Sequence, residues 1–365
     1  MTSVRIFFGL FAGTALLAGA AALAQAPAPS APPPAAAPAQ QGPWLTLAPF
    51  PDASEELLGA TAGGRLYVFA GLAPGWKPKG LVYEYDTETN KWTQKKQMPL
   101  LSHHLAFTSL NNKIYAFGGF KLPEGAPAWE PINNAWEYDP ANDSWKELAP
   151  MPTKRGAAAA AAVGGKIYVV GGASSLPGIT ENGIHPRRPH NVMATVEEYD
   201  PATNTWRERR PLLLARNHHV AAAVGNKVYV IGGRVGAAFI SGTSNNIDLV
   251  ETYDPAADLW TSGERMPTAR SAMAAGVHNN MIYVGGGEFQ DRRMLAALRA
   301  VETYDPAKNT WSIMPSMPNP RHGLAGGVIG DRFHLVSGDA QSAGSGAPSA
   351  HVDFHHALRL DPAGK

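Results

Sequence analysis

The chain has 365 residues, and its 31 basic side chains nearly balance 30 acidic ones. A net charge this close to zero provides no broad basic surface, so nucleic acid is not expected as a partner. The sequence contains no cysteine, which excludes disulfide bonds, thiolate chemistry and a lipid-bearing cysteine. The stability of the fold must therefore come from packing and hydrogen bonding.

The first 24 residues have the three parts of a secretory signal peptide. Arg5 is followed by an apolar stretch from Ile6 to Leu23 and by a small-residue site at Ala22-Leu23-Ala24. An uncleaved anchor helix is the alternative, because the apolar run approaches the length that spans a bilayer. We favour a cleaved peptide, which predicts a periplasmic or secreted protein whose mature form has no membrane span.

Residues 25–42 are rich in proline and alanine and cannot bury a core. Such a composition favours an extended polyproline II spacer. We therefore assign residues 1–24 to a signal peptide, residues 25–42 to a linker and residues 43–365 to one folded domain.

Beyond the linker, three short motifs recur with a period of about 50 residues. A glycine step comes first, a Tyr-Asp pair follows, and a tryptophan stands a fixed distance after that aspartate. The glycine steps are Ala70-Gly71, Gly118-Gly119, Gly171-Gly172, Gly232-Gly233, Gly286-Gly287 and, more weakly, Ser337-Gly338. The tryptophans are Trp44, Trp92, Trp145, Trp206, Trp260 and Trp311. A repeat of this length is typical of a β-propeller.

Each unit contains four short strand patterns, which are clearest in the fourth unit. Residues 219–224 are small and apolar, as expected of a strand near a crowded axis, and residues 227–231 are β-branched and aromatic. Residues 249–253 form a third strand, and a turn at Asp254-Pro255 leads to a fourth strand that carries the repeated tryptophan. Four antiparallel strands make one propeller blade.

The sixth unit lacks a fourth strand of its own after Leu360-Asp361-Pro362. Residues 43–47 carry Trp44, and Phe50-Pro51 follows it at the spacing seen after the other repeated tryptophans. We expect this N-terminal strand to complete the sixth blade. Such a closure joins the two ends of the domain in one sheet and removes open sheet edges.

The glycine step, Tyr-Asp pair and tryptophan in this register resemble the Kelch-repeat family, over residues 42–365. The resemblance implies an all-β fold, a six-bladed Kelch-type β-propeller whose last blade is closed by the N-terminal strand. Together with the signal peptide, it suggests an exported bacterial member. Because a fold does not fix a function, the function has to be argued from the site.

The two faces of the disc are expected to differ in their loops. Turns between first and second strands are tight, and those between third and fourth strands are short, as in residues 201–205. Loops between second and third strands are long and varied, and residues 173–194 form the longest. They share one face, the loop-rich face, with the connections between blades. Variable loops on a rigid scaffold commonly carry binding, so we expect a ligand there.

Four arginines occupy equivalent positions at the start of the first strands of blades three to six. They are Arg155, Arg216, Arg270 and Arg321. Rim arginines of similar Kelch propellers recognise acidic groups, and a guanidinium suits bidentate contact with carboxylate or sulfate. The alternative is that each arginine pairs with a backbone carbonyl or a carboxylate of its own blade. Both interpretations remain open, with the four as candidate ligand-binding residues.

Histidines begin the first strands of alternate blades. They are His103, His104, His218, His219 and His322. Three imidazoles converging on the axis would suit Zn²⁺ or Cu²⁺. The mouth of a propeller is wide for such short bonds, however, and solvated loop histidines are common. We therefore predict no metal and no cofactor, and take His104, His218 and His322 as candidate ligand-binding residues.

Loop acids and bases are weaker candidates, because none has a spacing diagnostic of catalysis. They are Glu55, Glu56, Glu288, Asp291, Arg292, Arg293, Asp339, His185 and His190, of which Glu288 is best placed, directly after a glycine pair. Trp76 and Trp129 lie in variable loops, where exposed tryptophan anchors sugars or protein surfaces. Packing over its own loop is the alternative for each. Glu288 and Trp129 complete the candidate ligand-binding set.

These observations favour an exported, non-enzymatic and monomeric binding module that recognises a protein, peptide or glycan through the loop-rich face. No catalytic motif is recognisable, so no catalytic residue is assigned and turnover is left open. The alternative is a sugar-converting enzyme, because exported Kelch propellers that resemble sialic-acid mutarotases or epimerases share the export signal and the ring. Copper-radical oxidases similar to galactose oxidase are excluded, since their cofactor requires a cysteine.

Overall fold

The computed structural model of the protein describes residues 39–126, 128–176, 191–236, 245–291, 294–343 and 349–360. The predicted signal peptide and most of the predicted linker lie outside these ranges. All described residues belong to one compact unit, Ala37–Lys365. Its regular elements are strands, and the described ranges contain no helix of the length and hydropathy needed to cross a membrane.

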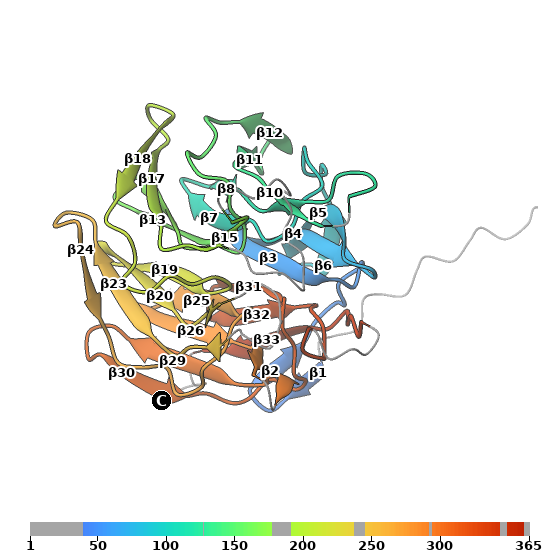
Figure 1. Ribbon diagram of the computed structural model, residues 1–365. Coiled ribbons are helices and arrows are strands. Elements are labelled where there is room, and N and C mark those ends of the chain that lie inside the picture. Colours follow the sequence, from blue (N-terminus) through green and yellow to red (C-terminus); the bar gives the residue numbers. More distant parts are fainter. Residues whose placement is uncertain are drawn as a thin grey trace, which may run out of the picture. The chain divides into compact units, whose positions relative to one another are not determined.

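Six antiparallel sheets form the blades (Figure 1). Blade one contains β3 (Glu55–Ala62), β4 (Arg65–Ala73), β5 (Lys77–Asp86) and β6 (Lys91–Gln94). Blade two contains β7 (Ala106–Leu110), β8 (Lys113–Phe117), β11 (Ala135–Asp139) and β12 (Ser144–Glu147). Blade three contains β13 (Ala159–Val163), β14 (Lys166–Val170), β17 (Val196–Asp200) and β18 (Thr205–Arg209).

The second half of the ring repeats this order. Blade four contains β19 (Val220–Val224), β20 (Lys227–Ile231), β23 (Val250–Asp254) and β24 (Leu259–Ser262). Blade five contains β25 (Ala274–His278), β26 (Met281–Gly285), β29 (Val301–Asp305) and β30 (Thr310–Ile313). Blade six contains β31 (Ala325–Ile329), β32 (Arg332–Val336), β33 (His355–Arg359) and the N-terminal β2 (Trp44–Thr46).

The closure of blade six confirms the predicted pairing of the two chain ends. Trp44 lies opposite Leu358, and Thr46 lies opposite His356, so β2 takes the place of the fourth strand (Figure 1). An additional strand, β1 (Ala39–Gln41), pairs with β2. It falls in the range that the sequence analysis assigned to the linker.

The six first strands surround the axis. β3, β7, β13, β19, β25 and β31 contact one another in this order, and β31 contacts β3. Small residues permit this approach: a Cβ added at Gly59 in β3 would lie 2.1 Å from the carbonyl oxygen of Gly326 in β31. The structure therefore confirms an all-β, six-bladed propeller.

The repeated tryptophan and Tyr-Asp motifs join each blade to the chain before it. The Trp206 indole donates to the carbonyl of Ala149 over 2.8 Å, and the amide of Ala149 donates to the side chain of Asn204 over 2.9 Å. The Tyr199 hydroxyl donates to the same Asn204 oxygen. Equivalent bonds recur at Trp92, Trp145, Trp260 and Trp311. The tryptophan thus bonds the chain of the preceding blade, and the tyrosine holds Asn204, which bonds the same residue of that chain.

The glycine step marks another contact between blades. Gly118 has φ +60°, and a Cβ there would lie 2.3 Å from the carbonyl oxygen of Arg155 in the next blade. The amide of Gly119 donates to that same carbonyl over 2.9 Å. A side chain would both strain this backbone and block the contact.

Between second and third strands, four loops carry a short two-stranded ribbon. These are β9 (Phe120–Lys121) with β10 (Glu130–Pro131), β15 (Ala173–Ser174) with β16 (Asn191–Val192), β21 (Arg234–Val235) with β22 (Asn245–Asn246), and β27 (Glu288–Gln290) with β28 (Leu295–Ala297). The ribbons begin directly after the glycine steps and build up the loop-rich face around the axis.

Candidate functional site

Three successive residues at the start of each first strand form the mouth of the propeller on the loop-rich face. The third residue of every triplet has a left-handed backbone, with φ between 52° and 56°. These residues are Glu56, His104, Ala157, His218, Ala272 and Gly323. Backbone hydrogen bonds connect them across blades, for example from Ala157 to His104 and from His218 to Ala157. The six therefore form an inner ring at the mouth.

The four predicted rim arginines occupy the first position of the triplets and are fully buried. Arg155 contacts the carboxylate of Glu197 at 2.5 Å, and Arg270 contacts that of Glu302 at 2.6 Å. Arg216 pairs with Glu251 in the same way. Each also donates to backbone carbonyls of its blade. The second interpretation, pairing within the blade, therefore describes these groups, which offer no surface to a ligand.

Arg321 departs from the other three arginines because its partner is a histidine. It contacts Nδ1 of His356 at 3.1 Å and donates to the carbonyls of Ser337 and Phe354. Without a carboxylate partner, burial lowers the pKa of Arg321 to about 9. Like the other three, Arg321 belongs to the packing of its blade and not to a ligand-binding rim.

The residue that follows each glycine step divides the mouth into two halves. In blades one to three it is apolar: Leu72, Phe120 and Ala173. In blades four to six it is charged: Arg234, Glu288 and Asp339. All six side chains are buried. We call these the apolar half and the charged half.

Trp129 belongs to the apolar half and is 5% exposed, which contradicts its prediction as an exposed anchor. Its ring stacks on Phe120 with centroids 6.1 Å apart and meets the His103 ring edge-on at 4.0 Å. Trp76 packs against it from outside. The alternative, that Trp129 packs over its own loop, agrees with the stacking on Phe120, and Trp129 also packs on His103 and Trp76 outside that loop.

A hydrogen-bonded network holds Glu288 in the charged half. Arg234 donates to the Glu288 carboxylate and to the side-chain oxygen of Gln290, each over 2.8 Å. The Ser342 hydroxyl and the Ala343 amide donate to the other Glu288 oxygen. Burial alone would raise the pKa of Glu288, but His322, Arg234 and these hydrogen bonds outweigh it and lower that pKa.

Next to this network, two histidines face a second carboxylate, that of Glu55. Nε2 of His322 lies 3.7 Å from one Glu55 oxygen, and Nε2 of His351 lies 3.5 Å from the other. His351 also faces Asp339 at 3.8 Å, and His322 faces Glu288 at 3.6 Å. Burial opposes a charge on His322, but the carboxylates of Glu288, Glu55 and Glu56 prevail and raise its pKa.

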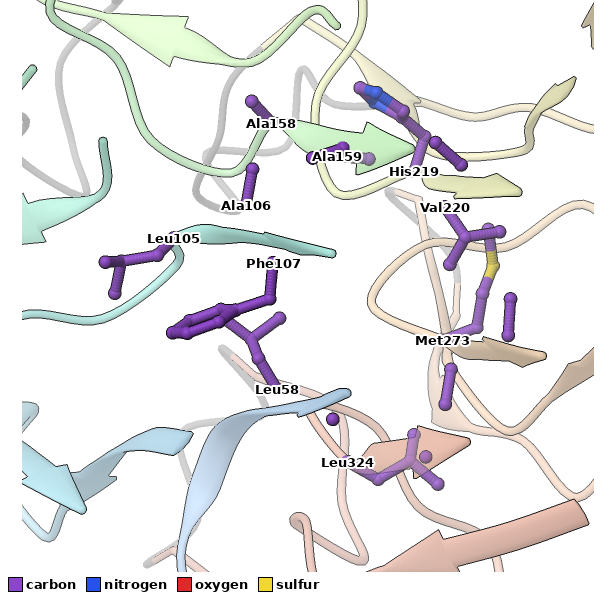
Figure 2. Close-up of a pocket in the computed structure, with 16 residues that line it drawn as sticks. Leu58, Leu105, Ala106, Phe107, Ala158, Ala159, His219, Val220, Met273 and Leu324 are labelled. Atoms are coloured by element: carbon purple, nitrogen blue, oxygen red, sulfur yellow. The ribbon is translucent and has the colours of Figure 1, made fainter. Parts of the chain in front are cut away.

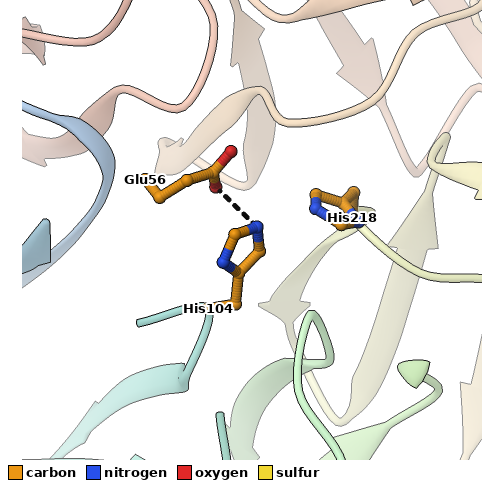
Figure 3. Close-up of side chains that lie close together, drawn as sticks. All are labelled: Glu56, His104 and His218. Atoms are coloured by element: carbon orange, nitrogen blue, oxygen red, sulfur yellow. Dashed lines mark ion pairs between the residues drawn. The ribbon is translucent and has the colours of Figure 1, made fainter. Parts of the chain in front are cut away.

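Glu56, His104 and His218 meet on the inner ring (Figure 3). Nε2 of His104 lies 3.1 Å from a Glu56 oxygen. His218 is bonded at both nitrogens, to Asn217 at 2.6 Å and to Arg234 at 2.9 Å. Burial raises the pKa of Glu56 to about 8 and lowers the pKa of His104 to about 3. His104 is therefore neutral at physiological pH, and Glu56 is able to hold a proton there.

His104, His218 and His322 do not converge as three equivalent ligands. His322 is the second residue of its triplet, whereas His104 and His218 are third residues. His322 therefore faces Glu55 of blade one and Glu288 of the charged half. Below the ring, an axial channel is lined by small and apolar side chains of the first strands, including Leu58, Phe107 and Met273 (Figure 2). Polar chemistry is thus gathered at the mouth.

Sequence reasoning missed two residues of the charged half, Arg234 and His351. Arg234 follows a glycine pair as Glu288 and Asp339 do, so that position was a usable signal. His351 lies in a long loop, and no feature of the sequence pointed to it. Asp291 lies at the tip of the ribbon β27–β28. The remaining candidates, Arg292, Arg293, His185 and His190, lie outside the described residues.

Comparisons with known proteins agree with this architecture. The KLHDC2/KLHL20/DRC7 Kelch-repeats domain matches residues 48–212, and the Kelch motif matches residues 215–267 and 269–318. Kelch-like protein terF of Aspergillus terreus is 29% identical over 74% of this chain and 57% of its own length. Kelch-like protein 23 of Mus musculus is 29% identical over 76% of this chain and 44% of its own length. The chain thus spans about half the length of these relatives.

A solved structure, entitled "Structure of YjhT", superposes with a TM-score of 0.68 over 85% of this chain and 95% of that one. Its sequence identity is 17%, so the likeness concerns the fold alone. The family matches run through five of the six blades and coincide with the glycine, tyrosine and tryptophan motifs. The chain belongs to the Kelch-repeat family.

Proposed function

We propose that the protein is an exported interaction module that binds a partner protein or peptide through its loop-rich face. One observation carries this proposal. Eight large apolar side chains are exposed in the described residues, and six of them lie in connections of that face. The six are Leu101, Leu213, Leu214, Met294, Leu295 and Phe354. Exposed large apolar side chains that lie mainly on one face favour contact with another macromolecule on that face.

The kind of ligand follows from the chemistry of this face. Aliphatic side chains and methionine suit a protein or peptide, whereas glycan sites commonly use exposed aromatic rings. Trp129 is buried, and Phe354 is the single aromatic residue among the six exposed side chains. A protein or peptide is therefore favoured over a glycan.

Two matched substitutions test which face binds. Leu101 on the loop-rich face and Leu259 at the tight-turn end of β24 are both 47% exposed. Leu101→Asp should weaken capture of a partner from an extract of the source organism, and Leu259→Asp should not. Equal capture by both variants would contradict the assignment of the face. Binding confined to a glycan array would reassign the ligand class.

Export rests on the N-terminal residues: Arg5, the apolar stretch from Ile6 to Leu23 and the small residues at its end. The test is N-terminal sequencing of the protein recovered from each cell fraction. A mature N-terminus near Gln25 in the exported fraction is expected. A full-length chain that remains in the cytoplasm would exclude export.

A second candidate is a sugar-converting enzyme, which the Glu56–His104 pair at the mouth favours, because such a pair is able to transfer a proton. The fold likeness described above does not distinguish the two functions. Interconversion of sugar anomers, followed by NMR with wild type and Glu56→Gln, separates them. Acceleration that is lost in Glu56→Gln would support the enzyme, and no acceleration by wild type would exclude that activity.

A further inference from the structure

His322 is a buried histidine whose two ring nitrogens have no hydrogen-bond partner among the described residues. Its side chain is 0% exposed. Leaving polar atoms of a buried side chain unpaired costs on the order of 1–3 kcal/mol for each group. The imidazole faces the carboxylates of Glu55, Glu56 and Glu288, and the donor atoms of Glu55, Glu56 and His322 all lie within 4.8 Å of one another.

The distances fit donors that share an ion better than donors that bond each other. Nε2 of His322 is 3.7 Å from the Glu55 oxygen, which is beyond hydrogen-bond range. Two donors bound to one tetrahedral Zn²⁺ at ~2.0–2.1 Å lie roughly 3.4 Å apart. A small side-chain adjustment would therefore place an ion between them.

Charge supports the same conclusion. The carboxylates of Glu55, Glu288 and Asp339 are at most 5% exposed, and Glu56 is close to them. Arg234 pairs with Glu288 at 2.8 Å, whereas Glu55 faces imidazoles. One imidazole offsets only part of the cost of burying several carboxylates together, and a divalent cation would offset more of it.

A second histidine lies close to each of the carboxylates of Glu55 and Glu56. His104 lies 3.1 Å from Glu56, and His351 lies 3.5 Å from Glu55. A hydrogen-bonded neighbour fixes the orientation of a ligating carboxylate, and His104 is close enough to do this for Glu56. By contrast, His218 is a poor ligand because both its nitrogens are engaged, one of them by the cationic Arg234.

We propose that Glu55, Glu56 and His322 bind one divalent transition-metal ion, with Zn²⁺ as the reference ion. Mixed nitrogen and oxygen donors select this class over Mg²⁺ and Ca²⁺, which prefer oxygen alone. Three protein donors leave a position for water or for an oxygen donor of a ligand at the mouth. The site replaces the expectation of a metal-free protein, and its donors differ from a triad of His104, His218 and His322.

The test uses full-length protein prepared without a histidine tag and freed of metal with a chelator. Titration with Zn²⁺, followed by calorimetry and by metal analysis after dialysis, should give one equivalent for wild type. Glu55→Gln and His322→Gln should each lower the affinity at least about tenfold. His334→Gln is the matched control, because His334 is also buried but lies in β32 away from the cluster. The His334→Gln variant should still bind one equivalent of Zn²⁺.

Thermal melting of the metal-free variants shows whether each one folds. If Glu55→Gln fails to fold, Glu56→Gln decides, because Glu56 is partly exposed and its loss disturbs less packing. Absence of a tightly bound equivalent in wild type would overturn the proposal, as would equal binding by wild type, Glu56→Gln and His322→Gln.

Discussion

The two halves of the mouth share one backbone design and differ in chemistry. In both halves, the residue after the glycine step pairs through its backbone with the triplet at the start of the first strand. Leu72, Phe120 and Ala173 fill this place in blades one to three, while Arg234, Glu288 and Asp339 fill it in blades four to six. The comparison teaches that the repeated framework sets positions, and that departures from the repeat decide what those positions do.

If packing holds the apolar half together, removal of its central ring should have the largest effect. Phe120 is fully buried, and its ring occupies the space beside Gly156, where an added Cβ would lie 2.6 Å from it. We expect Phe120→Ala to lower the free energy of unfolding by about 4 kcal/mol, measured by urea denaturation. Leu122→Ala, at the partly buried edge of the same cluster, should cost clearly less. Equal losses would argue against a packed centre.

The charged half should respond to loss of charge pairing instead. Arg234→Met keeps much of the side-chain volume but leaves Glu288 buried without its cation. We expect a loss of about 3 kcal/mol of unfolding free energy.

Adding Glu288→Gln to Arg234→Met should recover part of that stability, because the unpaired charge is then gone. The double variant thus separates charge from packing. If it is no more stable than Arg234→Met alone, the distinction between the two halves fails.

The framework was predictable from sequence because its motifs make local bonds that every blade needs. Trp206, Tyr199 and Asn204 repeat for this reason, and so does the glycine step. The same logic misled the assignment of ligands. Arg155, Arg216 and Arg270 each pair with a carboxylate of their own blade, and Arg321 bonds carbonyls and a histidine of its blade, so this recurrence indicates structure.

The site was harder to predict because its members come from different places in the repeat. His322 and Glu55 are second residues of their triplets, Asp339 follows a glycine step, and His351 lies in a long loop. Their proximity depends on how blades one and six and the long loop of blade six meet at the axis. No spacing along the chain encodes that meeting.

Departure from the repeat does not by itself make a site, and blade six shows this. His334 stands where the other five blades carry tyrosine, and it bonds His355 at 2.9 Å inside the blade. Burial lowers the pKa of His334 to about 4 and also lowers the pKa of His355 well below its usual value. The unfolded chain binds protons near pH 6.5, so the folded state loses stability as pH falls from about 6.5 toward 4.

We expect a loss of roughly 2 kcal/mol from His334 over that range, measured by chemical unfolding at a series of pH values. His334→Tyr restores the residue of the other blades and should flatten the slope. It should leave partner binding unchanged. An unaltered pH slope would mean that other groups dominate the acid sensitivity of the fold.

The smallest expected change in stability concerns the position of the arginine's partner, which recurs in blades three to six. His356 occupies the place of Glu197, Glu251 and Glu302, the partners of the arginines in blades three to five. His356→Glu would give the buried Arg321 a carboxylate, and we expect a gain of about 1 kcal/mol in unfolding free energy at pH 7, since desolvation offsets most of the attraction. His356→Gln is the control, because it supplies an acceptor without charge and should give no gain. If His356→Glu is no more stable than His356→Gln, charge pairing does not explain why the arginine pairs recur in the other blades. Hydrogen bonding and packing would then explain their recurrence.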